Sequence, residues 1–164
     1  MVSADGIHLS NSDCHGNNIY FNDIAASATN GVLVDDDAHD DTIESNTSED
    51  NAGAGIRIVN GTHNWITRND INNNGGLGID LAAEGVTLND NDSMPPAPDY
   101  ANRGQNFPML DAARGGHHAG NVTFTLTSTP GDYTIELMVA PTCDSSGYGE
   151  KWFTSTIGTA RPAW

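Results

Sequence analysis

Residues 31–48 begin with Gly31-Val32-Leu33-Val34, pass through an acidic stretch, and end with Thr42-Ile43-Glu44-Ser45-Asn46-Thr47-Ser48. Aliphatic side chains two positions apart, as at Val32 and Val34, point to the same face of a β-strand. An amphipathic helix would instead need apolar residues spaced by three and four over a longer stretch. The stretch therefore predicts short strands with inward aliphatic and outward polar side chains.

The same pattern recurs on both sides of this stretch. Its glycines stand at positions 6, 31, 55 and 78, so the steps are 25, 24 and 23 residues. An asparagine late in each repeat, at Asn22, Asn46 and Asn69, steps by 24 and 23 residues. A period that varies by one or two residues places the variation in a loop of each turn.

Stacking of these repeats predicts a coil of parallel strands about 4.8 Å apart, with aliphatic ladders inside. We expect the ladders to be Ile7/Val32/Ile56/Ile79, Leu9/Val34/Ile58/Leu81 and Ile19/Ile43/Ile66. Asn22, Asn46 and Asn69 recur where the chain turns after a strand, and their amides can bond to the turns above and below. We expect them to form a structural asparagine ladder without a catalytic role.

The rest of the chain lacks this period. Residues 83–120 hold Pro95, Pro96, Pro98 and Pro108 among many Asp, Asn and Gly residues, which predicts an irregular cap or linker. Alternating patterns then predict three strands, at 121–128, 132–140 and 151–157. The expected organisation is coil turns over 1–82, the cap over 83–120, and a small, truncated β-rich module over 121–164.

The period near 24, with its Gly-Ile and Asn-x-Ile motifs, resembles the right-handed parallel β-helix repeat. That repeat is shared by pectate lyases, polysaccharide-modifying epimerases and many large bacterial surface proteins. After residue 75 the chain is similar to the end of the coil in bacterial exported proteins of this group, where a small β module follows. The segments that carry this likeness are Gly76–Leu81, Gly85–Asp90, Gln105–Leu110, Cys143-Asp144 and Ser146–Glu150. The resemblance implies an all-β fold of three to four coil turns, and export.

Charge limits the partners. Aspartate and glutamate number 22 against 6 lysines and arginines, which gives a formal net charge of −16. Nucleic acid and anionic lipid are disfavoured because no basic patch offsets the repulsion. Cations, basic proteins, and neutral or cationic glycans remain, and adaptation to high salt is another interpretation of the charge. The sequence contains no run of 18 apolar residues, so it does not predict a membrane-spanning helix.

We expect an extracellular or cell-surface location, with any export signal upstream of this chain and the chain itself a fragment of a larger protein.

The densest acidic cluster is a candidate calcium site, because a hard divalent cation with oxygen ligands would relieve the repulsion among its carboxylates. A solvated acidic loop is the alternative, and the spacing matches no EF-hand. The cluster comprises Asp35, Asp36, Asp37, Asp40 and Asp41. Within it, Asp37-Ala38-His39-Asp40 is similar to the Asp-Pro-His motif of alginate epimerases, with Ala38 in place of the proline.

Three histidines, His15, His39 and His63, are each 24 residues from the last. If the turns are in register, their imidazoles lie above one another at one corner, about 5 Å apart. Such a ladder predicts a zinc or copper site, which Asp13, Asp37 or Asp40 could complete. The alternative is that they are exposed loop residues without a shared ligand.

Two function classes remain. The first is a non-catalytic surface module whose coil binds glycan, cations or a partner protein. The second is a calcium-dependent polysaccharide-acting enzyme, a lyase, hydrolase or epimerase, whose weak catalytic candidates are Asp37, His39, Asp40 and Arg57. Acids are plentiful and suitable bases few, which favours binding. The open strand edges of a short coil also predict edge-to-edge self-association.

Overall fold

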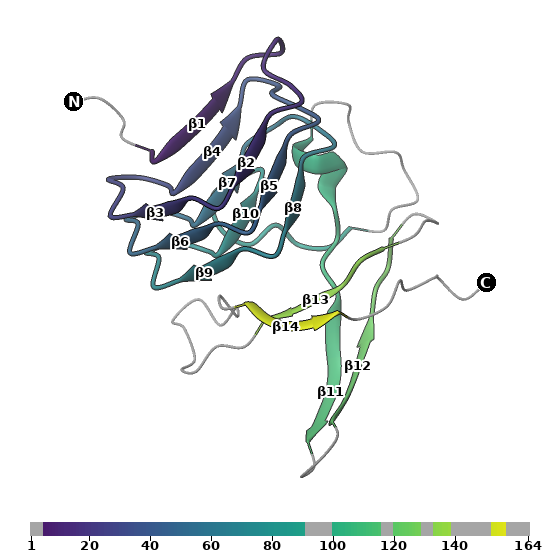
Figure 1. Cartoon of the computed structure of the whole chain (residues 1–164). Coiled ribbons are helices and arrows are strands. Elements are labelled where there is room, and N and C mark those ends of the chain that lie inside the picture. Colours follow the sequence, from purple (N-terminus) through teal and green to yellow (C-terminus); the bar gives the residue numbers. More distant parts are fainter. Residues whose placement is uncertain (1–4, 91–99, 116–119, 129–132, 139–151, 157–164) are drawn as a thin grey trace.

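The fold is almost entirely β in the computed structural model, which describes residues 5–90, 100–115, 120–128, 133–138 and 152–156. Three parallel sheets form the walls of a coil (Figure 1). The first contains β1 (Ile7–Ser10), β4 (Val32–Asp35), β7 (Ile56–Ile58) and β10 (Ile79–Leu81). The second contains β2 (Asn18–Tyr20), β5 (Thr42–Glu44) and β8 (Trp65–Thr67). The third contains β3 (Asp23–Ala25), β6 (Thr47–Glu49) and β9 (Asp70–Asn72).

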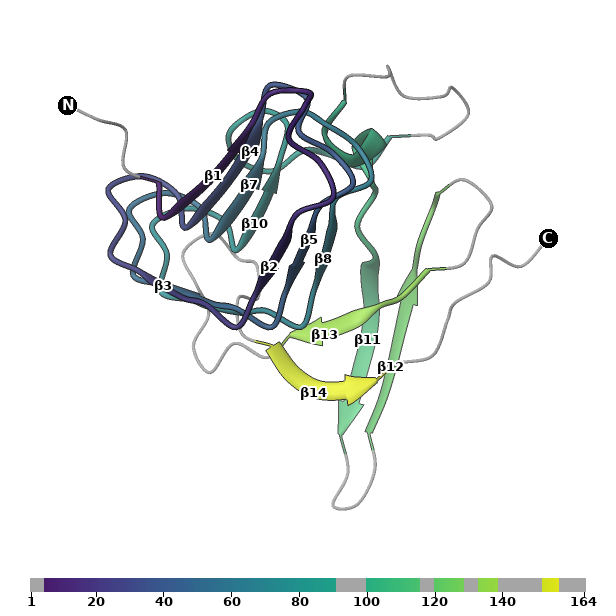
Figure 2. The same cartoon turned by 45° about the horizontal axis from the view of Figure 1, so that its top comes forward.

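The interior of the coil is built from aliphatic ladders, and the predicted stacking is confirmed. Ile7, Val32, Ile56 and Ile79 are paired in successive strands, as are Leu9, Val34, Ile58 and Leu81. Ile19, Ile43 and Ile66 form a third ladder of this kind, in the second sheet. The third sheet contributes Ile24, Ser48 and Ile71. Turned by 45°, the first and second sheets stand on opposite sides of this interior (Figure 2).

The glycine that starts each repeat allows neighbouring turns to approach closely. A Cβ added at Gly31 would lie 2.1 Å from Ser48 Oγ and 2.5 Å from the carbonyl oxygen of Gly55. At Gly55 it would lie 2.4 Å from Ile71 Cγ2 and 2.8 Å from Gly78 O. The repeat therefore needs glycine because no side chain fits at this corner.

Asparagine ladders close the corners of the coil. Asn22 N–H donates to Asn46 Oδ1, and Asn46 N–H donates to Asn69 Oδ1, each at 2.9 Å. The side-chain amide nitrogens also donate to carbonyl groups of the preceding turn, Asn46 Nδ2 to Ile19 O and Asn69 Nδ2 to Ile43 O. Asn46 and Asn69 are buried, so these bonds satisfy backbone groups that water does not reach.

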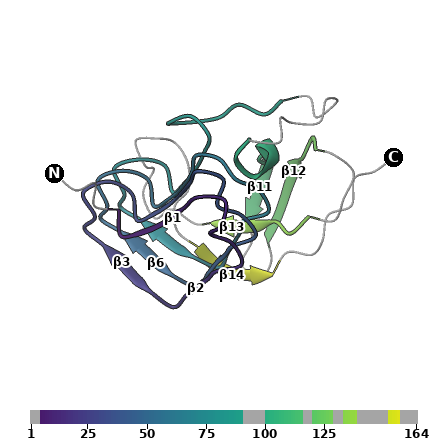
Figure 3. The same ribbon diagram turned by 90° about the horizontal axis from the view of Figure 1, so that it is seen from above.

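Beyond the coil, a 3-10 turn η1 (Ala101–Gly104) covers the last turn. Ala101 is fully buried, and Asn102 extends a corner ladder by accepting the Asn64 N–H at 2.9 Å. Seen from above, η1 lies between the coil and the hairpin that follows (Figure 3).

Two antiparallel strand pairs follow η1. The first pair is β11 (Met109–Gly115) with β12 (Gly120–Thr125), and the second is β13 (Glu136–Met138) with β14 (Trp152–Thr156). β11 differs from the sequence prediction, which made residues 83–120 irregular. All of its residues are exposed, so pairing with β12 rather than burial forms the strand. The predicted Cys143–Glu150 marker lies outside the described residues.

Candidate functional site

The corner between the first and second sheets carries most of the predicted metal ligands. His15 and His39 form an isolated bridge, and their rings stack with centroids 5.2 Å apart. Asp40 lies between two histidines: its Oδ2 is 3.7 Å from His39 Nε2 and its Oδ1 is 3.6 Å from His63 Nδ1. The corner therefore brings together His15 from the first turn, His39 and Asp40 from the second, and His63 from the third.

His63 does not continue the stack of His15 and His39. Val34 pairs with Ile58, a separation of 24, but Thr42 pairs with Trp65, a separation of 23. The corner of the third turn is thus one residue shorter than that of the second. His63 aligns with Asp40 instead of His39, although its sequence spacing of 24 suggested stacking.

Asp41 occupies a different environment from the other four predicted calcium ligands. Asp35 is the last residue of β4, and Asp36, Asp37 and Asp40 lie in the loop after it, whereas Asp41 is fully buried. Its Oδ1 accepts Asn17 N–H at 2.7 Å and Asn17 Nδ2 at 2.9 Å, and its own N–H donates to Asn64 Oδ1. Asp41 is thus a member of a second corner ladder, with Asn17, Asn64 and Asn102.

No three His, Cys, Asp or Glu side chains of the described residues converge closely enough to hold a metal ion as they stand. The calcium and transition-metal sites therefore stay predictions.

Arg57 lies away from the other catalytic candidates. It extends outward from β7, as the alternation predicted, and its charged neighbours are Asp80 Oδ2 and Glu84 Oε2, each 3.9 Å away. Asp37, His39 and Asp40 belong to the corner after β4. Among the described residues, no ion pair or hydrogen bond joins Arg57 to these three, so acid, base and arginine do not form one cluster.

Asp80 is a buried carboxyl on the outer side of the first sheet. It is 2% exposed, and the Gly85 N–H donates to its Oδ2 at 3.2 Å. Burial raises the pKa of Asp80, and Glu84 adds to the rise, while the Gly85 N–H and Arg57 oppose it. Asp80 Oδ1 and Arg57 Nε are buried without hydrogen-bond partners among the described residues. The Asp80 carboxyl is therefore buried beside the segment after β10, which contributes the Gly85 N–H.

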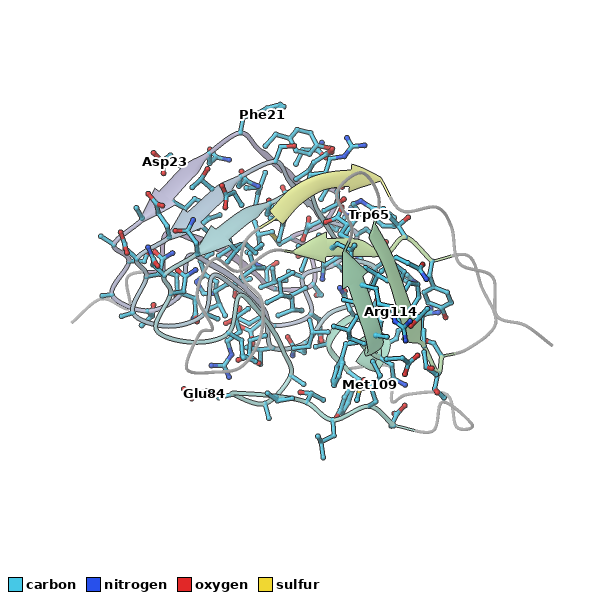
Figure 4. All side chains as sticks on the ribbon, turned by 90° about the horizontal axis from the view of Figure 1, so that it is seen from below. Phe21, Asp23, Trp65, Glu84, Met109 and Arg114 are labelled. Atoms are coloured by element: carbon cyan, nitrogen blue, oxygen red, sulfur yellow. The ribbon has the colours of Figure 1, made fainter. Side chains whose placement is uncertain are left out.

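The outer face of the second sheet carries two exposed aromatic side chains. Tyr20 is 41% exposed and Trp65 is 55% exposed. Register places Asn18, Thr42 and Trp65 in one column, and Tyr20, Glu44 and Thr67 in the next. Arg68 follows β8 and pairs with Glu44 Oε1 at 2.9 Å. Figure 4 labels Trp65, and shows Glu84 on the opposite side of the view from Phe21.

This geometry can now be compared with known proteins. The profile of the family described as "right handed beta helix region" matches residues 2–93, which is more than half of the chain. The chain belongs to the right-handed β-helix family. No curated protein and no solved structure matches this β-helix. In its described part, no helix is long and apolar enough to cross a membrane.

Sequence reasoning missed several features of this β-helix. The second corner ladder had a signal, because Asn17, Asp41 and Asn64 step by 24 and 23 residues. A third ladder, in which Ser27 N–H donates to Asn51 Oδ1 and Asn51 N–H to Asn74 Oδ1, had a step of 23. The Tyr20–Trp65 face had a weaker signal, namely aromatic residues beside the inward isoleucines of β2 and β8. Asp80 had none, because its burial comes from a segment outside the repeat.

Proposed function

We propose that this β-helix is a non-catalytic extracellular or cell-surface module that binds a neutral or cationic glycan. The binding surface is the outer face of the second sheet, hereafter the aromatic face, made by Asn18, Tyr20, Thr42, Glu44 and Trp65. The observation that supports the proposal is the exposure of Tyr20 and Trp65 on a regular strand surface with polar side chains between them.

The spacing of the two rings suits an extended oligosaccharide. Trp65 is on the third turn and Tyr20 on the first, in adjacent columns of the sheet. Two strand spacings and two residues along a strand separate the backbone positions by about 12 Å. Aromatic faces offer flat apolar surfaces to the C–H side of sugar rings, and polar neighbours bond to hydroxyl groups. Thr42 and Glu44 lie between the rings and supply such polar groups.

Charge selects among glycans. The chain carries −16 and the aromatic face contains Glu44, whose charge Arg68 partly offsets. A polyuronate would meet a repulsive surface, whereas a neutral or amine-bearing polymer would not. The enzyme alternative, which needs an anionic polymer held through calcium, therefore has less support.

Binding to soluble polysaccharides tests the proposal. Calorimetry with a neutral glucan oligosaccharide, a chitosan oligosaccharide and oligogalacturonate should show binding to one of the first two and none to the third. Trp65→Ala and Tyr20→Ala should each weaken binding by about tenfold, because each removes one stacking surface. Tyr100→Ala is the matched control, because Tyr100 is 43% exposed and stands at the start of η1, outside the aromatic face.

Three outcomes would contradict the proposal: no binding to either uncharged or cationic glycans, unchanged binding by Trp65→Ala, or equal losses with Tyr100→Ala. Release of new reducing or unsaturated ends from oligogalacturonate with calcium would instead support the enzyme.

A further inference from the structure

Three asparagine–glycine pairs occur in the chain: Asn30-Gly31, Asn60-Gly61 and Asn74-Gly75. In such a pair the glycine backbone nitrogen can attack Cγ of the asparagine, since glycine has no Cβ to obstruct the approach. An N–Cγ bond forms, the Cγ–Nδ2 bond breaks, and ammonia leaves with the proton lost by the glycine nitrogen. Water then opens the five-membered imide to aspartate or isoaspartate. The reaction needs a free attacking nitrogen and a free leaving nitrogen.

The fold blocks both atoms in two of the pairs. Gly31 N–H donates to Ala54 O at 2.9 Å, and Asn30 Nδ2 donates to Asp5 Oδ1 at 3.0 Å. Gly75 N–H donates to Asn51 O at 2.8 Å, and Asn74 Nδ2 donates to Ser48 O at 3.0 Å. Attack would break coil hydrogen bonds at both ends of the reacting unit, so these pairs are protected while the coil is folded.

Asn60-Gly61 differs from both. Among the described residues, neither Gly61 N–H nor Asn60 Nδ2 has a hydrogen-bond partner. Asn60 Oδ1 accepts the Asp37 N–H at 3.1 Å. That bond is aimed at the oxygen on which negative charge develops when Cγ is attacked, and a donor so placed lowers the barrier. Asn60 is half-buried in the loop after β7, whereas Asn74 is buried.

We propose that Asn60 is a site of spontaneous deamidation, and the reactive one of the three asparagine–glycine pairs in the folded protein. Gly61 cannot be replaced to slow the reaction, because a Cβ there would lie 2.0 Å from Ala38 O. Packing of the coil therefore requires a glycine after Asn60, and this glycine is also what makes Asn60 susceptible to deamidation.

The product changes two neighbouring structures. Aspartate at 60 adds a carboxylate beside the Asp37 backbone, within the acidic corner after β4. Isoaspartate also inserts an extra carbon into the main chain next to Gly61, whose carbonyl oxygen accepts the Asn102 N–H at 2.8 Å. Deamidation thus alters the charge of the acidic corner and the attachment of η1 to the coil.

Peptide mapping of the whole chain after incubation at mildly alkaline pH tests the inference. We expect a gain of about one dalton, the difference between an amide and an acid, at Asn60. Its rate should exceed the rates at Asn30 and Asn74 by about tenfold or more. In strong denaturant all three pairs should react at similar rates, because the hydrogen bonds that protect two of them are gone.

Asn60→Gln is the matched variant, since its longer side chain forms the cyclic product more slowly, and its folded protein should gain no mass at this position. Two results would overturn the inference. One is an Asn60 that stays intact in the folded chain while it reacts in denaturant. The other is reaction of Asn30 or Asn74 in the folded chain as fast as Asn60.

Discussion

Asp41 is an aspartate in a ladder otherwise made of asparagines. Asn46 Nδ2 bonds to Ile19 O at 2.9 Å and Asn64 Nδ2 to Ala38 O at 3.2 Å, each on the preceding turn. At Asp41 an oxygen replaces that donor, and Oδ2 is buried without a partner among the described residues. The coil thus lacks one hydrogen bond that its other corners make, and buries an acceptor instead.

Replacing Asp41 with asparagine should stabilise the protein. The amide supplies the missing donor and keeps Oδ1 as the acceptor for Asn17, so the free energy of unfolding should rise by about 0.5–1.5 kcal/mol. Urea denaturation at neutral pH measures it. Asn46→Asp makes the reverse change in the neighbouring ladder and should destabilise. An Asp41→Asn variant no more stable than the parent would show that Oδ2 is satisfied in solution.

Asp80 predicts a specific pH dependence. Because burial raises the pKa of its carboxyl, the folded state holds this proton more tightly than the unfolded state. The stability that Asp80 contributes is fully present below the unfolded pKa and is lost as pH rises through the folded pKa. Asp80→Asn removes this loss, so the variant should gain melting temperature relative to the parent as pH rises from acid to neutral.

Thermal unfolding of both proteins from about pH 3 to about pH 8 measures the difference. Glu84→Gln removes the same formal charge from a side chain that is 89% exposed, and should show a much smaller trend. A constant gap between the parent and Asp80→Asn across the range would contradict the prediction.

At the scale of the strands, stacking in register carries the stability of the coil. Ile43 is fully buried between Ile19 and Ile66 on β5. Ile43→Asp should prevent folding, because it buries an unpaired charge at a cost of several kcal/mol. Ile43→Val should cost only about 0.5–1.5 kcal/mol. Circular dichroism and thermal melting distinguish these results, and a folded Ile43→Asp with unchanged melting would contradict the stacking.

The coil was predictable because each repeat has the same short pattern, a glycine followed by alternating aliphatic residues. Alternation at Val32 and Val34, with glycine before them, fixed the inward face and the turn-to-turn partners. His63 was not predictable in the same way, because the glycine steps average over a whole turn and conceal the one-residue difference between neighbouring corners. β11 was missed because its residues stay exposed, and a strand held only by its partner leaves no burial pattern in the sequence.

The candidate site was less accessible to sequence reasoning than the fold. The sequence analysis grouped Asp41 with Asp37 and Asp40 because they are close in sequence. At a corner of the coil, however, neighbouring residues can point to opposite sides, one into the interior and the next into solvent. The aromatic face depends on which strand neighbours Trp65 and Tyr20 across the sheet. That neighbourhood follows from the register of Ile19, Ile43 and Ile66, which was predicted. The exposure of the two rings depends instead on what packs against the sheet, and the repeat pattern does not encode it.

For the whole molecule, the net charge of −16 implies self-repulsion in the compact state. Added sodium chloride should therefore raise the melting temperature, since about 0.1 M salt screens charges beyond about 10 Å. Thermal unfolding in chelator, with sodium chloride and with calcium at matched ionic strength, measures the effect. A melting temperature indifferent to sodium chloride would contradict the prediction. A gain specific to calcium would locate a cation site in the acidic corner.

Both ends of the described coil have strand edges. Among the described strands, β1, β2 and β3 at one end and β10, β8 and β9 at the other each have a parallel neighbour on one side only. Edge-to-edge self-association of this chain therefore stays a prediction.

The corner ladders also have a direction. In the three ladders that contain Asn46, Asp41 and Asn51, the backbone N–H of a turn donates to a side-chain oxygen supplied by a later residue, as Asn22 donates to Asn46. The corner of Asn30 has the opposite direction, because Asn30 N–H donates to Asp5 Oδ1 and Ala54 N–H donates to Asn30 Oδ1. During synthesis on the ribosome, we expect a newly emerged turn to hold donors of these three ladders whose acceptors are supplied only by the next turn. In one of these ladders the last acceptor is Asn102, which lies outside the repeat. We therefore expect these three ladders to be completed in the direction of translation.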